Sequence, residues 1–157
     1  MSQLKQLKSR FSLGFVALCI LFTSQFSYAG DFYEHNGAAI DGYDPVAYFT
    51  ENRPVHGVKE ITLEYKGSMF LFASVANRDK FKTSPESYMP QFNGYCAYGA
   101  AGGYKAKIDP EAFSVVDGKL YLNYNATVKT MWNKDVGGYI DKAEKLWPKT
   151  VMTKFSP

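Results

Sequence analysis

The chain has little cysteine and little histidine, and this limits the chemistry that it can support. Of its 157 residues, two are cysteines, Cys19 and Cys96, and two are histidines, His35 and His56. No CxxC or HxxxH pair occurs, so the sequence has none of the usual spacings of a multi-ligand metal site. A lone cysteine can be a buried apolar residue, a reactive thiol or a single metal ligand.

The sequence also lacks an apolar run long enough to cross a bilayer. Residues 11–22 are apolar over only a dozen positions, whereas a transmembrane helix needs roughly 20. Basic residues precede this run, and the small residues Ser27 and Ala29 follow it, in the order typical of a signal peptide. We therefore predict a signal peptide at residues 1–29 and a mature domain at 30–157. The predicted location is periplasmic or secreted, without stable membrane insertion.

Removal of this segment changes both the cysteine count and the charge. Cys19 is lost, so Cys96 becomes the single cysteine and an internal disulfide is excluded. Three basic and no acidic residues are lost, so the 18 basic and 15 acidic residues of the full chain become 15 of each. A balanced charge gives no support for nucleic acid as a partner. The sequence does not identify a protein partner.

Turn signals divide the mature chain into hairpins and short helices. Two-residue turns are expected at Lys66-Gly67 and Asp117-Gly118, each between runs of alternating apolar residues. Ser74 is the expected N-cap of one helix, and Pro148 is the expected end of another. We expect strands at 61–65, 69–72, 113–116 and 120–124, and helices at 75–82, 127–135 and, beyond a break at Gly137-Gly138, 139–147.

The pattern predicts the α+β class, with a small single domain in which β-hairpins pack against short helices. No internal repeat of the length found in repeat proteins is evident, and no low-complexity linker divides the chain. Trp132 and Trp147 are expected to anchor the core of the C-terminal helices. Asp44 and Asp109 each precede proline and are expected to cap turns rather than act as acids.

The most specialised stretch is residues 93–105, NGYCAYGAAGGYK, which contains Cys96 and four glycines. It lacks the GK[ST] ending of a P-loop, so a tight turn against aromatic rings is the better interpretation. Cys96 has three interpretations: a ligand for copper or zinc with His56 or His35 nearby, a nucleophilic or redox thiol, or a buried apolar residue.

Tyrosines surround this cysteine in the sequence and recur in two further segments. Their phenols either line a pocket with Cys96 at its floor or act as half-buried wedges between the sheets and the helices. The candidate ligand-binding residues are Cys96, Tyr43, Tyr48, Tyr95, Tyr98 and Tyr124, and the candidate metal ligands are Cys96 and His56.

Three segments together resemble an exported YHS-domain protein. They are IDGYDPVAYF at 40–49, YKGSMFLFAS leading to NRDKFKTSPESYMPQFNGYCAYG at 65–99, and DGKLYLNYN at 117–125. The resemblance implies a small α+β domain. In its metal-associated members it implies cysteines near the DPV element and in the strand-to-helix turn. This chain has Ala47, Ala73 and Asn77 at those places, so the usual thiolate site is not carried over.

We interpret the chain as an exported small binding module for a metal ion or small ligand near Cys96. The alternatives are a thiol-based redox or catalytic protein that uses Cys96 and a structural or interaction domain without a ligand. No catalytic residue is assigned, and the residues favour a non-enzymatic protein without deciding the question. The cofactor is unknown, with copper and zinc as the candidates.

Overall fold

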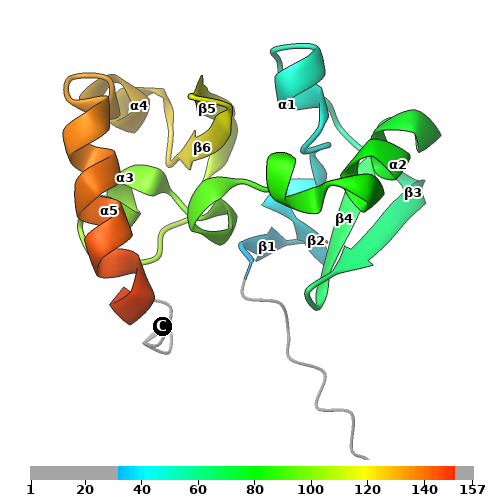
Figure 1. Ribbon diagram of the computed structural model, residues 1–157, viewed down its shortest axis with the longest axis horizontal. Helices are drawn as coiled ribbons and strands as arrows, with labels where there is room; N and C mark the ends of the chain where they lie inside the picture. The colour runs from blue at the N-terminus through cyan, green and yellow to red at the C-terminus, as the bar shows by residue number, and fades with distance from the viewer. Residues whose placement is uncertain (1–31, 151–157) are drawn as a thin grey trace, which may run out of the picture.

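Three two-stranded antiparallel hairpins and five α-helices make up residues 32–150, the part of the chain that the computed structural model describes (Figure 1). The strands are β1 Glu34–His35, β2 Ala38–Ala39, β3 Val58–Tyr65, β4 Ser68–Phe72, β5 Asp109–Val116 and β6 Lys119–Asn123. The helices are α1 Ala47–Thr50, α2 Val75–Thr83, α3 Ala97–Ala101, α4 Ala126–Trp132 and α5 Val136–Thr150, with 3-10 turns at Ile40–Gly42, Pro85–Ser87 and Gln91–Gly94. The predicted α+β class is confirmed, whereas the predicted signal peptide lies outside the described residues.

Both predicted hairpins form, and the same backbone turn closes each of them. Lys66 and Gly67 have φ of +49° and +79°, and Asp117 and Gly118 have +49° and +71°. Positive φ at both central residues matches the twist of the flanking strands. The first strand of each hairpin starts earlier than predicted, because pairing resumes beyond an irregularity in register.

Residues 40–83 and 92–132 repeat one order of elements, and we call them unit one and unit two. Each unit contains a 3-10 turn, a short helix, a hairpin and a longer helix. The paired residues Thr62 and Leu71 of unit one correspond to Phe113 and Leu122 of unit two, 51 residues later on both strands.

The capping and core residues of the two longer helices follow the same offset. The side chain of Ser74 accepts the N–H of Asn77 at the start of α2, and that of Asn125 accepts the N–H of Val128 at the start of α4. Phe81 and Trp132 are both fully buried. The offset therefore extends from the hairpins into the helices.

The turns that open the two units also match, with an offset of 52 residues. Ile40, Asp41 and Gly42 have φ of +46°, +59° and +77°, and residues 92–94 have +53°, +52° and +77°. Two positions beyond each turn come Asp44 and Cys96. The Asp44 N–H donates to Val55 O at 2.8 Å, and the Cys96 N–H donates to Ala106 O at 3.1 Å. Asp44 and Cys96 are thus equivalent positions.

The sequence analysis predicted no internal repeat of the length found in repeat proteins. The structure nevertheless contains two units with the same order of elements. The two hairpin-helix segments share few residues, among them Gly67 with Gly118 and Leu71 with Leu122. Turn geometry and apolar alternation preserve the arrangement, and neither requires identical residues.

Three hydrophobic clusters fill the domain, one in each unit and one between them. Phe70, Phe72 and Phe81 pack in unit one. Trp132 and Tyr121 pack with Ala143 of α5 in unit two. The shared cluster consists of Ile40, Tyr48, Cys96, Ile108, Leu120 and Leu122. Figure 1 shows the two units side by side, with α5 along the outer side of unit two.

Three local predictions about the C-terminal half need correction. Gly137-Gly138 do not interrupt a helix, because they lie in the first turn of α5, where the Asp135 carboxylate accepts the N–H of Gly138 at 3.0 Å. Pro148 does not end α5, which continues to Thr150. The stretch predicted as a turn contains the short helix α3. None of the helices in residues 32–150 is long and apolar enough to span a bilayer.

Candidate functional site

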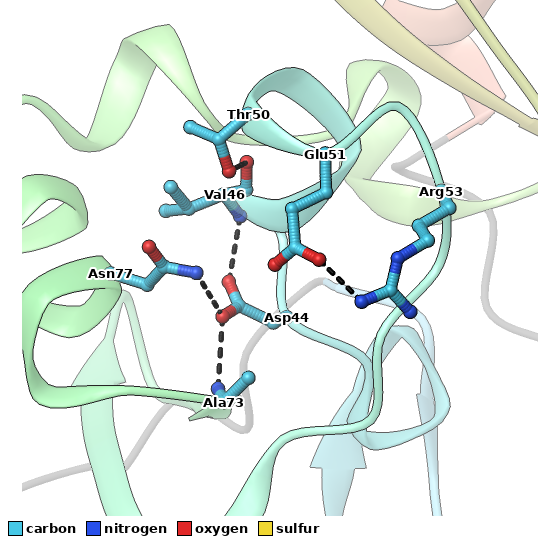
Figure 2. Close-up of polar contacts among 7 residues, drawn as sticks. All are labelled: Asp44, Val46, Thr50, Glu51, Arg53, Ala73 and Asn77. Carbon is cyan, nitrogen blue, oxygen red and sulfur yellow. Dashed lines mark hydrogen bonds and ion pairs between the residues drawn. The ribbon is translucent and has the colours of Figure 1, made fainter.

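Asp44 is a fully buried carboxylate that joins the entry of α1 to the entry of α2 (Figure 2). One oxygen accepts the N–H of Val46 at 2.8 Å. The other accepts the Ala73 N–H at 2.9 Å and the Asn77 side-chain amide at 2.7 Å. Charge-assisted bonds of this kind are stronger than neutral ones. The prediction that Asp44 caps a turn is confirmed, as it is for Asp109, which accepts the Glu111 N–H.

This carboxylate lies where the family resemblance implies metal-binding thiols. Ala73 and Asn77 meet the DPV element, so the expected convergence of the two segments is present. The side chains at this place, however, do not provide metal ligands. Alanine offers no ligand, and both Asp44 oxygens already accept hydrogen bonds. Unit one therefore has a hydrogen-bonded cluster at this place.

Cys96 occupies the equivalent place in unit two as the N-cap residue of α3. Its sulfur accepts the N–H of Gly99 at 3.4 Å, and its S–H donates to Asn123 Oδ1 at 3.9 Å. The same Asn123 oxygen accepts the Tyr98 N–H at 3.3 Å. Burial raises the pKa of the Cys96 thiol, and the N–H groups of Gly99, Tyr124 and Tyr98 act in the opposite direction. The neutral thiol is therefore the favoured form.

An apolar cavity of about 290 Å³ lies against Cys96. Its lining comes from the start of α3, the loop that follows α3, the end of β6 and one face of α4. The lining residues are Cys96, Tyr98, Tyr104, Ala106, Tyr124, Val128 and Met131. Cys96 is only 2% exposed, whereas Tyr104, Tyr124 and Met131 are 53%, 40% and 38% exposed. The thiol thus forms the inner end of the cavity, and the large side chains form its rim.

The glycines of the specialised stretch hold one wall of this cavity in place. A Cβ on Gly102 would lie 2.6 Å from the Tyr104 ring, and one on Gly99 would lie 3.2 Å from it. The ring can therefore rest on the backbone of α3 only because side chains are absent there. The glycine pattern positions Tyr104 rather than a phosphate.

The structure brings Cys96, Tyr98 and Tyr124 together, and it places the other candidate residues elsewhere. Tyr48 is buried in the shared cluster, and its hydroxyl donates to Pro110 O. Tyr95 is buried against Trp147. Tyr43 packs on the exposed ring of His56, with ring centroids 4.0 Å apart.

The predicted metal site would need further ligands beside Cys96 and His56, and the cavity lining does not supply them. His56 does not belong to the lining, and His35 is exposed and bonded to Asp41. Within residues 32–150, no group of three or more His, Cys, Asp or Glu side chains is placed to hold a metal ion. One thiol, one thioether and phenols do not supply the three or four Cys, His, Asp or Glu ligands of an ordinary zinc site.

Four lining residues were not predicted from the sequence: Tyr104, Ala106, Val128 and Met131. Tyr104 lies within the specialised stretch, and its position beside glycines was an available signal. Val128 and Met131 are three residues apart on α4 and so share one helix face. Only the fold shows that this face turns toward Cys96.

A search against family models gives one match, the YHS domain, at residues 46–92. No curated protein and no solved structure matches the chain. The matched segment begins just after Asp44 and ends at the opening turn of unit two, so it covers most of unit one. The similarity to the YHS domain is therefore limited to residues 46–92, fewer than half of the residues of the chain.

Proposed function

We propose that the protein is an exported, non-enzymatic module that binds a small apolar ligand in the Cys96 cavity. The observation that carries the proposal is the difference between equivalent positions in the two units. Asn77 fills its place in unit one by donating to Asp44. The side chain of its counterpart Val128 has no hydrogen-bond donor and borders an open cavity. Apolar walls with a few polar groups are typical of small-molecule sites.

The chemistry of the cavity favours a ligand whose neutral or weakly polar part contacts Cys96 at the inner end. Cys96 is held as a neutral thiol by burial, and sulfur makes favourable contacts with aromatic rings. Thiol catalysis would instead require a thiolate and a base within hydrogen-bond reach. Neither histidine lines the cavity, so the geometry supports binding better than catalysis.

The cavity is tested with the neutral fluorescent probe N-phenyl-1-naphthylamine and the protein comprising residues 30–157. We expect saturable binding, measured as a rise in probe fluorescence. Val128→Phe should lower the affinity at least about tenfold, because the added ring fills the cavity. Val75→Phe is the matched control, since Val75 is 51% exposed on α2 and lies outside the cavity. Circular dichroism checks that both variants fold.

Absence of saturable binding to the parent protein would overturn this proposal. Equal binding by the parent and a folded Val128→Phe variant would also overturn it. Met131→Ala provides a second measurement, because it shortens a rim residue that is 38% exposed and should alter probe affinity with little effect on folding.

Export is supported by the basic, apolar and small-residue order of residues 1–29. The test is expression of the full chain in a bacterial host, followed by N-terminal sequencing of the periplasmic fraction. We expect a mature protein that begins at Gly30. Recovery of the uncleaved chain in the cytoplasm alone would contradict export.

A further inference from the structure

A lysine ammonium lies over one of the aromatic rings that line the Cys96 cavity. Lys107 Nζ is 5.2 Å from the ring centroid of Tyr124, which is one wall of the cavity. None of the ion pairs found within residues 32–150 involves Lys107. Asp109, the nearest acid along the chain, uses a carboxylate oxygen to accept the Glu111 N–H. Lys107 is therefore available to an external anion.

Positive charge also lies beside a second wall. The Tyr98 hydroxyl interacts with Tyr139, an interaction that raises the pKa of Tyr98, whereas the charges of Lys134 and Lys142 act in the opposite direction. No acidic side chain lines the cavity. The apolar lining therefore has cations near its rim and no lining anion to balance them.

We propose that the cavity selects a small aromatic ligand with one carboxylate or equivalent anionic group at the rim, next to Lys107. This inference rests on the proposed function and names the ligand class for the same site. The ring is buried against the sulfur and phenol groups, where transfer from water is favourable. The anionic group stays at the water-exposed mouth, where it avoids the cost of burying a charge.

The test compares two probes of nearly equal shape, phenylacetate and phenylacetamide, by isothermal titration calorimetry at low salt. We expect phenylacetate to bind about three- to fivefold more tightly, the size of effect typical of one partly exposed charge pair. Lys107→Gln should remove this preference, and Lys107→Glu should reverse it. Lys119→Glu is the matched control, because Lys119 is exposed on β6 and lies outside the cavity.

Equal affinity for the two probes, or a preference that persists in Lys107→Glu, would overturn this inference and leave the neutral-probe result intact. If neither probe binds a protein that does bind N-phenyl-1-naphthylamine, this inference is overturned and the proposed function stands. Failure of all three probes would overturn the proposed function as well. Raised salt should weaken phenylacetate binding and leave phenylacetamide binding unchanged.

Discussion

Asp44 and Cys96 occupy equivalent positions in two units of similar fold, yet one position is closed and the other adjoins a cavity. The Asp44 carboxylate accepts three hydrogen bonds, from two backbone N–H groups and from Asn77. The Cys96 sulfur accepts weaker bonds, and valine replaces the asparagine. Burial of a carboxylate requires such partners, whereas burial of a thiol does not.

The difference shows how one scaffold can hold either a structural connection or a cavity. In unit one, a charged acceptor and an amide fill the space between the short helix and the longer one. In unit two, Tyr124 and Val128 replace Ala73 and Asn77, and the polar contact between helices is missing. Polar groups therefore stabilise the first unit at the place where the second gains room for a ligand.

The largest expected effect is on stability, from removal of the Asp44 carboxylate. Asp44→Ala leaves three buried or half-buried donors without an acceptor, and we expect a loss of about 3–4 kcal/mol in the free energy of unfolding. Cys96→Ala should cost only about 1–2 kcal/mol, because the sulfur makes weak hydrogen bonds beside an existing cavity. Urea unfolding of residues 30–157 measures both.

Asp79→Ala is the control for this pair, since the Asp79 side chain is 57% exposed on α2. It should change stability by no more than about 0.5 kcal/mol. The contrast between the units would be wrong if Cys96→Ala destabilised the protein as much as Asp44→Ala.

The helix caps test whether the two units are energetically as well as structurally equivalent. Ser74→Ala and Asn125→Ala each remove a side-chain acceptor from the first turn of a helix, and each should cost about 1 kcal/mol. Thermal unfolding provides the measurement. Ser74→Thr keeps the hydroxyl and serves as the control. A large cost for one cap and none for the other would indicate that one unit alone limits stability.

A pair of glycine substitutions tests the wall formed by Tyr104. Gly102→Ala places a methyl group 2.6 Å from the ring, so we expect a loss of about 1 kcal/mol in stability and weaker probe binding. Gly137→Ala meets nothing within 4 Å on α5, so it should stabilise the protein by about 0.4–1 kcal/mol. Denaturation and probe titration separate the two effects. Unchanged probe binding by Gly102→Ala would remove Tyr104 from the site.

The smallest expected effect is on the pH dependence of stability. Because burial raises the Cys96 pKa in the fold, the unfolded chain loses this proton at lower pH. The stabilising contribution is complete below the thiol's ordinary pKa of 9.0 and is lost as pH rises above it. The parent should therefore lose more stability than Cys96→Ser between pH 7.5 and 9.5. Parallel curves for the two proteins would contradict the raised pKa.

The sequence predicts the hairpins and the capped helices well, because their signals are local. Two-residue turns such as Asp117-Gly118 and caps such as Ser74 act through neighbouring backbone groups. The start of β3 and the helix α3 were not predicted, since pairing across an irregular register and packing against α5 decide them. Local patterns cannot supply such long-range information.

The site was predicted only in part, for the same reason. Cys96 was found because the stretch around it is unusual in composition, and Tyr98 and Tyr124 were found because they lie in the segments that resemble the YHS family. Val128 and Met131 belong to an ordinary helix and have no distinguishing signal. Tyr48 and Tyr95 share the same residue type with the cavity tyrosines, but the fold directs them into the core.

The location of Asp44 determines how small a piece of this protein can be made to fold. The family match starts at residue 46, two residues after the carboxylate that holds Ala73 and Asn77. A chain cut to residues 46–92 would lose this acceptor and would expose Tyr48, which packs with Ile40 and Leu120 in the shared cluster. Fragments intended for crystallisation or binding assays should therefore begin before the opening turn at Ile40 and retain both units.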